Sequence, residues 1–371
     1  MLGTRHRRME RNELLVAGNH PALQHHAQPV AGGLPRPLPL FLDLVRDAAA
    51  RDPDAARHAL QGLRLYRDAP RSPAPPKPIA FTHGRASVID GAGLDGPIIL
   101  LVPSLINASS VLDLAPGNSL LEYLGQHGTR PFLLDWGNPT LGDRDQSVAE
   151  HVSNILVPII RRLAGPVHLV GYCLGGTMAM AAASLTHVQS LTLLASPWRF
   201  GHYPPDSRQA ALAHWSEHRG IVQALGMMPV EFLQPLFWGL DPDRSVAKFA
   251  NLARQRVSAR KLSAFVALED WANSGSPITA AAAQELFQSF IGEDLPGAGR
   301  WVVDGHCVDE AALTCPSIHF VASNDRISPA AAAPHTIPTV TCPSGHVGMV
   351  TGSRAQTGCW NPLREWVMHS A

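Results

Sequence analysis

The five residues Gly171-Tyr172-Cys173-Leu174-Gly175 limit the possible fold more than any other stretch of this chain. They follow the strand-like run VHLV and precede the small-residue run GTMAMAAA, and they match the nucleophile-elbow pattern G-x-S-x-G with cysteine in place of serine. Such an elbow is a sharp, strained turn from strand to helix, and it needs glycines because a Cβ would obstruct the neighbouring backbone. The pattern predicts that Cys173 is a nucleophile; the alternative is a buried structural cysteine in a glycine-rich turn.

Short apolar runs alternate with amphipathic stretches from about Gly84 onward. The runs are rich in Val, Leu and Ile, and they include PIILLVP, PFLLDW, VHLVGY and LTLLAS. This alternation favours a mostly parallel sheet with helices on both faces, which is a doubly wound α/β fold. The rhythm stops at about residue 198 and resumes after about residue 299, and the mostly helical segment between them predicts a lid insertion.

The N-terminal part of the chain has a different character. Residues 1 to about 35 show no periodicity, and the segment RSPAPPKP (residues 71–78) is too rich in proline for a helix or a central strand. Apolar residues between them recur at helical spacing, and Asp52-Pro53 predicts a break between two short helices. We therefore expect a tail, helical cover and linker in residues 1–83, and a catalytic domain in residues 84–371.

Composition excludes several classes of protein. The chain of 371 residues carries 30 Lys and Arg against 30 Asp and Glu, so no basic field favours nucleic acid. Charged residues make up only 16% of the chain, which suggests an apolar partner or substrate. The five cysteines include no C-x-x-C pair, so we expect neither a disulfide framework nor a zinc ribbon, and a reducing cytoplasm fits best.

Targeting, membrane and metal signals are also weak. The first twenty residues contain arginines but no continuous apolar segment, and no later run reaches the roughly 18 apolar residues of a spanning helix. We expect no signal peptide and no transmembrane segment. Cys342 and His346 could suggest a metal pair, but two ligands without a third do not form a metal site. We therefore expect no metal and no cofactor.

An elbow nucleophile needs a base and an acid that orients it, and both follow later in the chain. Asp325 follows the apolar run IHFVAS after one asparagine, at the end of a predicted strand where α/β sheets carry functional groups. His346 lies in the loop CPSGHVGMV after the last apolar run. Their order and placement single them out, although an aspartate in an Asn-Asp turn is often only a turn residue and most of the 18 histidines are solvated or packed.

Backbone N–H groups are expected to complete the site. The unpaired N–H groups at the start of a helix favour the thiolate form of a cysteine placed there. The N–H of Leu174 is then one predicted oxyanion donor. The second should come from the loop after PIILLVP, where Ser104, Leu105 and Ile106 are candidates and Leu105 is preferred by analogy with other elbows.

Several motifs in the same order resemble those of polyhydroxyalkanoate synthases, the cysteine-nucleophile branch of the alpha/beta-hydrolase fold. The smaller synthases, which lack a long N-terminal domain, are the most similar, and the resemblance covers about residues 36–366. The segments that carry it are VPSLINASSVLDLAPGNSLLEYLGQHG, FLLDWGNP, GYCLGG, ALEDWANSG, CPSIHFVASNDRISP, PSGHVGMV and TGCW. Two positions depart from the family pattern: Arg326 follows the acid where histidine is usual, and no Asn-Pro follows SGHVGMV.

The resemblance implies a mechanism and a substrate. It places the nucleophile on Cys173, the acid on Asp325 and the base on His346. The family's reaction is acyl transfer from a 3-hydroxyacyl-CoA thioester to a growing polyester, in which Asp325 either orients His346 or helps to activate the attacking hydroxyl. It also implies a cytoplasmic enzyme associated with polyester granules, acting as a homodimer or with a second synthase subunit.

Two other functions remain open from the sequence. The same scaffold could serve a cysteine-dependent esterase, thioesterase or polyester depolymerase, in which water accepts the acyl group. A non-catalytic protein that binds granules or a synthase subunit belongs to another class, and nothing about binding alone requires Cys173, Asp325 and His346.

Overall fold

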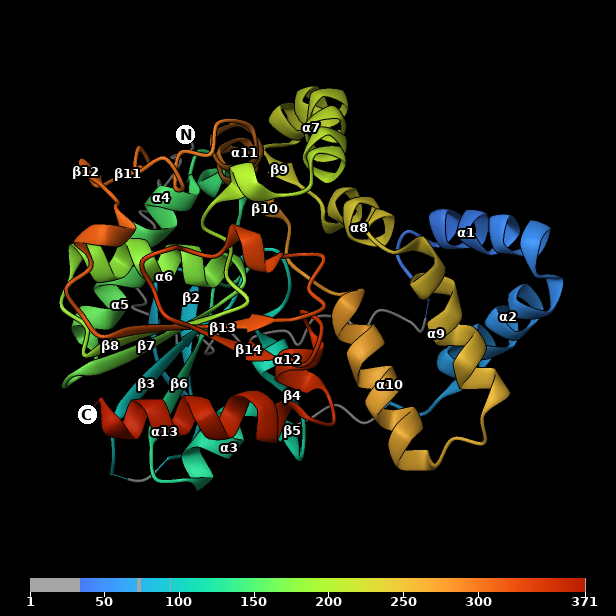
Figure 1. The fold of residues 1–371 in the computed structure, drawn as a ribbon, viewed down its shortest axis with the longest axis horizontal. Helices are drawn as coiled ribbons and strands as arrows, with labels where there is room; N and C mark the ends of the chain where they lie inside the picture. The colour runs from blue at the N-terminus through green and yellow to red at the C-terminus, as the bar shows by residue number, and fades with distance from the viewer. Residues whose placement is uncertain (1–33, 72–74, 94, 371) are drawn as a thin grey trace, which may run out of the picture.

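An eight-stranded sheet forms the centre of the protein in this computed structural model, which describes residues 34–71, 75–93 and 95–370 (Figure 1). In spatial order the strands are β1 (Ile79–His83), β2 (Ala86–Asp90), β6 (Arg130–Asp135), β3 (Ile98–Val102), β7 (Val167–Tyr172), β8 (Ser190–Leu194), β13 (Ser317–Ala322) and β14 (Thr339–Cys342). All neighbours from β6 to β14 are parallel, whereas β1 and β2 form an antiparallel hairpin at one edge. The predicted mostly parallel sheet is confirmed.

The first strand shifts one predicted boundary. Residues up to 83 were assigned to the cover and linker, but β1 pairs with β2 and belongs to the sheet. Its residues are exposed or half-buried, so it lacks the continuous apolar run that identified the central strands. The predicted tail in residues 1–33, where a signal peptide was not expected, and residues 72–74 of the linker lie outside the described residues.

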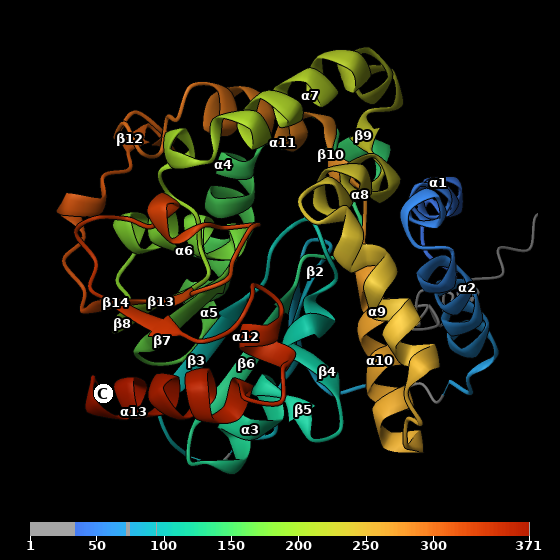
Figure 2. The same ribbon diagram turned by 45° about the vertical axis from the view of Figure 1, so that its right-hand side comes forward.

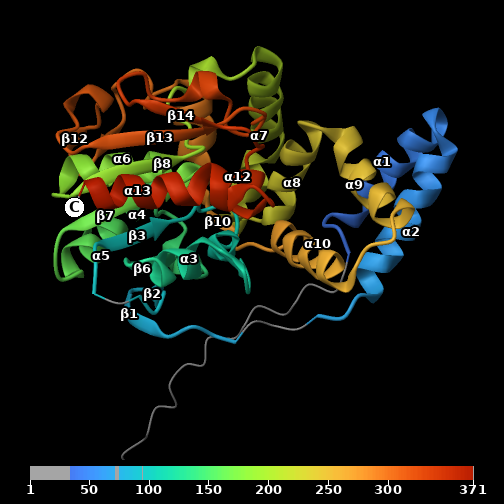
Figure 3. The same cartoon turned by 60° about the horizontal axis from the view of Figure 1, so that its bottom comes forward.

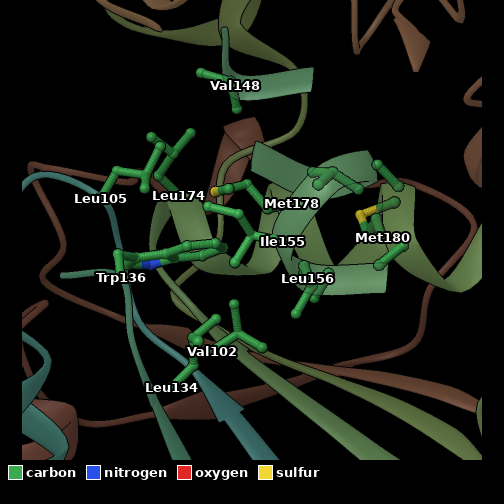
Figure 4. Packing of buried hydrophobic residues seen from close by; sticks show 14 of the residues in the cluster. Val102, Leu105, Leu134, Trp136, Val148, Ile155, Leu156, Leu174, Met178 and Met180 are labelled. Atoms are coloured by element: carbon green, nitrogen blue, oxygen red, sulfur yellow. The ribbon is translucent and has the colours of Figure 1, made fainter. Parts of the chain in front are cut away.

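Helices cover both faces of the sheet. Alternate residues of β3 point to opposite faces, so Ile99 and Leu101 pack with α3 (Leu120–Gln126) and α13 (Asn361–His369). Leu100 and Val102 instead join the cluster that contains α4 (Val148–His151), α5 (Val157–Arg162) and α6 (Leu174–Leu185). Figure 4 shows this second cluster, in which Met178 and Met180 of α6 lie over the strands. Every residue of β3 and β7 is buried, as expected for strands covered on both faces.

The segment between β8 and β13 is mainly helical. Its principal helices are α7 (Pro205–Leu225), α8 (Val230–Gly239), α9 (Pro242–Arg254), α10 (Ala259–Ala272) and α11 (Ala280–Gln284). The small strands β9 (Met227–Met228) and β10 (Ile278–Thr279) pair with each other inside it. Further short elements of the chain are β4 (Asp113–Ala115), β5 (Asn118–Ser119), β11 (Val302–Val303), β12 (His306–Cys307) and α12 (Gly348–Thr351).

Two N-terminal helices pack on this insertion. Helices α1 (Leu38–Arg51) and α2 (Pro53–Asp68) meet at Asp52, whose carboxylate accepts a hydrogen bond from the N–H of Ala55 at 2.9 Å and so caps α2. The rings of Phe41 and Phe249 lie 5.0 Å apart at the centre of a third apolar cluster, built from α1, α2 and the insertion. In Figures 2 and 3, α9 and α10 lie between the sheet and the α1–α2 pair. Among the described residues, no helix is both long enough and apolar enough to span a membrane.

Candidate active site

Cys173 occupies a strained turn between β7 and α6. Its backbone has φ 55° and ψ −131°, a conformation that residues with a Cβ rarely adopt. The N–H of Cys173 donates to the carbonyl of Leu194 at 2.9 Å, and its own carbonyl accepts from Gly176 at 2.9 Å. The end of β7 therefore projects the thiol at the start of α6, as the elbow pattern predicts.

The surrounding glycines are required by close contacts. A Cβ on Gly175 would lie 2.3 Å from the carbonyl oxygen of Val102, and a Cβ on Gly176 would lie 1.8 Å from Oγ of Ser196. A Cβ on Gly171 would meet Cα of Gly176 at 2.3 Å. No side chain fits at these separations, so the local sequence allows α6 to approach both neighbouring strands closely.

Asp325 and His346 are brought together from two neighbouring loops. The N–H at Nδ1 of His346 donates to Oδ2 of Asp325 at 2.7 Å. The other carboxylate oxygen of Asp325 accepts the backbone N–H groups of Ile327 and Ser328, each at 2.8 Å. The Asp325 side chain is fully buried and that of His346 is 6% exposed, so the pair is held in one orientation away from water.

The charge state of His346 depends on Cys173 and Asp325. Burial alone would lower the pKa of His346, but the charges of Cys173 and Asp325, with a hydrogen bond to each, outweigh it and raise the pKa to about 10. His346 thus contacts the thiol on one side and the carboxylate on the other. The ring of Tyr172, the residue before the thiol, lies 5.2 Å from the imidazole ring and supports it. The three side chains form a series in which His346 lies between Cys173 and Asp325, and both neighbours favour its protonated form.

Cys173 and His346 open into a mainly apolar cavity of about 190 Å³. The loop after β3, the insertion helices α8 and α10, and the loop around His346 supply its walls, including Val111, Phe237, Trp238, Trp271 and Val347. A second cavity of about 200 Å³ shares His346 with the first and is lined by Arg244 and Arg326. Arg326 contacts Asp241 at 3.2 Å, whereas no ion pair is recorded for Arg244 within the described part of the chain. The apolar cavity therefore continues into a cleft that bears positive charge.

The predicted oxyanion donors come from the elbow itself and from the loop after β3. Leu174 is the first residue of α6, and Figure 4 shows it close to Leu105 in the buried cluster. Ser104 and Ile106 line the cavity that contains Cys173, whereas Leu105 lines a neighbouring cavity. The N–H of Ile106 donates to Oγ of Ser104 at 3.1 Å and is already engaged. The choice of Leu105 as the second donor stays a prediction.

The structure also identifies residues that the sequence did not single out. The indole N–H groups of Trp136 and Trp271 donate to backbone carbonyls of the loop after β3. Both tryptophans belong to segments that resemble the synthase family, DWGNP and EDWANSG. Those segments were the sequence signal by which the two residues could have been identified. No metal-binding group of three or more His, Cys, Asp or Glu side chains occurs in the described ranges.

Three other histidines have structural partners. His319 lies in β13, where its Nε2 accepts the N–H of Ser196 at 3.1 Å and burial lowers its pKa to about 4. His168 pairs with the hydroxyl of Ser190 at 2.8 Å inside the sheet. His151 lies against the guanidinium of Arg85 at 2.6 Å. These contacts explain why they are buried without taking part in the series around Cys173.

Comparison with known proteins agrees with the fold and the motifs. A model of the alpha/beta hydrolase family matches residues 99–357. Poly(3-hydroxyalkanoate) polymerase subunit PhaC from Haloferax mediterranei is 27% identical over 289 residues, which cover 72% of this chain and 58% of that protein. The PhaC subunit from Haloarcula marismortui is 24% identical over 284 residues, 72% of this chain and 60% of that protein. The PhaC subunit from Allochromatium vinosum is 26% identical over 303 residues, 75% of this chain and 82% of that protein.

These matches confirm the resemblance to polyhydroxyalkanoate synthases that the motifs predicted. The chain spans about three fifths of the length of the first two of these relatives.

Proposed function

The chain belongs to the alpha/beta hydrolase family, and we propose that it is a polyhydroxyalkanoate synthase-like acyltransferase that transfers 3-hydroxyacyl groups from CoA thioesters to a growing polyester. The observation that carries this proposal is the buried His346–Asp325 pair in contact with a cysteine on the elbow, at the base of an apolar cavity. A thiol suits this reaction because exchange between two thioesters is nearly balanced, so the acyl group is stored without being committed to water.

In the first half of the reaction, His346 accepts the thiol proton and the Cys173 thiolate attacks the thioester carbonyl carbon. The new carbon–sulfur bond forms, the bond to the CoA sulfur breaks, and His346 returns its proton to the departing CoA thiolate. In this proposal, the N–H of Leu174 and a donor from the loop after β3 stabilise the negative charge that develops on the carbonyl oxygen. The raised pKa of His346 makes its imidazole a stronger base for the thiol proton.

In the second half, the hydroxyl of a chain end or of a monomer attacks the acyl group on Cys173. His346 removes the hydroxyl proton, the ester bond forms, and the proton restores the thiol as the bond to Cys173 breaks. Asp325 keeps its contact with the Nδ1 of His346, so that the other ring nitrogen remains available to the reacting groups.

The two connected cavities support the choice of substrate. An acyl or polyester chain fits the apolar walls around Phe237 and Trp271, whereas the CoA phosphates need cations. Arg244 and Arg326 line the cleft that continues from His346 and supply those cations. The helical insertion then acts as the lid of the acyl cavity, and the catalytic domain begins with β1 at Ile79. The same proposal has the enzyme act as a homodimer or with a second synthase subunit, at the surface of a polyester granule.

A cysteine-dependent hydrolase is the alternative, because the same three residues would hydrolyse the acyl-enzyme if water replaced the hydroxyl. Purified protein incubated with 3-hydroxybutyryl-CoA separates the two functions. We expect CoA release with insoluble polyester; CoA release with free 3-hydroxybutyrate alone would identify the hydrolase. Loss of CoA release in Cys173→Ala is the control in both cases. Failure of the wild-type protein to acylate Cys173 in a single turnover, both alone and with a synthase partner subunit, would contradict both catalytic functions for this substrate and favour the non-catalytic binding protein.

A further inference from the structure

Two tryptophans hold the loop that follows β3. Nε1 of Trp136 donates to the carbonyl of Pro103 at 3.0 Å, and Nε1 of Trp271 donates to the carbonyl of Ala108 at 2.9 Å. The two carbonyls lie at the ends of the segment from Pro103 to Ala108, which faces Cys173 across the cavity. Both indoles are buried, with 6% and 9% of their surfaces exposed. Each end of the loop therefore has one hydrogen bond that little water can replace.

The two indoles come from different parts of the molecule. Trp136 follows β6 and packs in the buried cluster that Figure 4 shows. Trp271 lies on α10 of the insertion and forms part of the cavity wall. The insertion also meets the loop directly, because a Cβ on Gly275 would lie 3.0 Å from the carbonyl oxygen of Ile106. One end of the loop is thus fixed by the sheet and the other by the lid.

Helix α10 is in turn fastened to the N-terminal helices by the residue before Trp271. Asp270 accepts the hydroxyl of Tyr66 at 2.6 Å. The guanidinium of Arg71 donates to both carboxylate oxygens of Asp270, at 2.9 Å and 3.1 Å. The side chains of Arg71 and Asp270 are 18% and 20% exposed, so this contact is better shielded than a surface ion pair. The α1–α2 cover therefore sets the position of the turn of α10 that presents Trp271.

We propose that Trp271 is a positioning residue, which makes the geometry of the oxyanion loop depend on the position of α10 and of the cover that holds it. If α10 moves away, the carbonyl of Ala108 loses its indole donor and keeps only the longer contact from the N–H of Val111 at 3.4 Å. The loop then relaxes, and the donor that it presents to Cys173 is no longer held in place. The proposal rests on the proposed function in one respect, which is that this loop stabilises the reacting carbonyl oxygen.

Trp271→Phe removes the N–H donor and keeps an aromatic ring in the wall. We expect the single-turnover rate of Cys173 acylation by 3-hydroxybutyryl-CoA to fall about 10-fold, less than the loss of a whole oxyanion donor, with KM changed by less than about twofold. Trp301→Phe is the matched control, because the indole of Trp301 donates to Glu285 at 2.7 Å and does not contact the loop. Its acylation rate should stay within about twofold of wild type. Equal losses in both variants would overturn the proposal.

Hydrogen exchange tests the same coupling without any reaction. The amides of residues 104–108 should exchange about 10-fold faster in Trp271→Phe than in wild type or Trp301→Phe, because a released carbonyl frees the loop. Hydrogen exchange can be measured even if the chain does not react with hydroxyacyl-CoA. Failure of the proposed function and failure of this inference are therefore distinguishable. Unchanged exchange in the loop of a folded Trp271→Phe protein would contradict the inference.

Tyr66→Phe extends the test to the cover, far from the substrate. It removes one hydrogen bond to Asp270, so the loop amides should exchange faster, by a smaller factor than in Trp271→Phe. If the cover acts through Trp271, the double variant should exchange no faster than Trp271→Phe alone. If the increases in exchange rate of the two single variants multiply in the double variant, the cover and the indole act separately. That result would overturn the coupling.

Discussion

At the strand ends, Cys173, Asp325 and His346 are held by backbone geometry and by hydrogen bonds to neighbouring loops. The insertion contributes to the same cavity from helices that pack on other helices. The side chain of Trp271 links it to the loop after β3, and that of Asp270 links it to the N-terminal cover. The contacts of the first region allow one arrangement only, because the backbone of α6 packs directly against the neighbouring strands. The strands and the elbow thus form a rigid frame that holds the candidate catalytic residues, and the insertion adds a cavity wall that side-chain contacts hold in place.

The largest expected effect is at the rigid frame. Cys173→Ala should abolish CoA release, because no covalent intermediate can form, while the smaller side chain leaves the fold intact. Cys173→Ser should retain little activity, since a hydroxyl is a much weaker nucleophile at neutral pH. CoA release measured alongside circular dichroism checks both. Wild-type turnover in Cys173→Ala would remove this cysteine from the mechanism, and wild-type activity in Cys173→Ser would point to an ordinary hydrolase.

Asp325→Asn tests which of two roles the acid has within that frame. We expect steady-state turnover to fall by about two orders of magnitude or more, whereas the first acylation of Cys173 remains rapid and acyl-enzyme accumulates. The reason is that a cysteine at a helix start needs less help than an alcohol that must attack a thioester. Mass spectrometry of a single turnover with hydroxyacyl-CoA decides the point. Acylation slowed as severely as turnover would mean that Asp325 only orients His346.

A pair of glycine substitutions compares the two regions in stability. Gly176→Ala should lower the free energy of unfolding by about 2–3 kcal/mol, because its Cβ would overlap Ser196 at the centre of the frame. Gly220 lies exposed in α7 of the insertion with nothing within 4 Å of a Cβ, so Gly220→Ala should stabilise the protein by about 0.5–1 kcal/mol. Urea denaturation of the two variants tests the contrast. A similar decrease in the free energy of unfolding in both would contradict it.

The smallest expected effect is on titration. Because the charge of Cys173 helps to raise the pKa of His346, the pKa should be lower in Cys173→Ala than in wild type when followed by NMR. A raised folded-state pKa stabilises the protein fully below the unfolded value of 6.5, and that stability is lost as pH rises towards about 10. The loss of stability between these pH values should therefore be shallower in Cys173→Ala. An unchanged His346 titration would show that the thiol and the imidazole do not interact.

The catalytic candidates and the mostly parallel sheet could be predicted because their signals are local. An elbow requires glycines beside the nucleophile, a buried strand requires a continuous apolar run, and the chain order of Cys173, Asp325 and His346 follows the order of the strands. Strand β1 was missed because its half-exposed residues carry no such run. His346 stood out among 18 histidines by its loop, yet only the structure brings its ring to 2.7 Å from Asp325.

What the sequence by itself determined about this protein is therefore the elbow, the sheet and the candidates for the reacting groups, since each of these signals depends on residues within a few positions of one another. Only the tertiary structure decided which carbonyls Trp136 and Trp271 bind and how Tyr66 reaches Asp270, 204 positions away. The physical reason is that an indole or a phenol can be buried wherever one hydrogen-bond acceptor meets it. Its partner is chosen by how the layers pack, and no spacing along the chain records that choice.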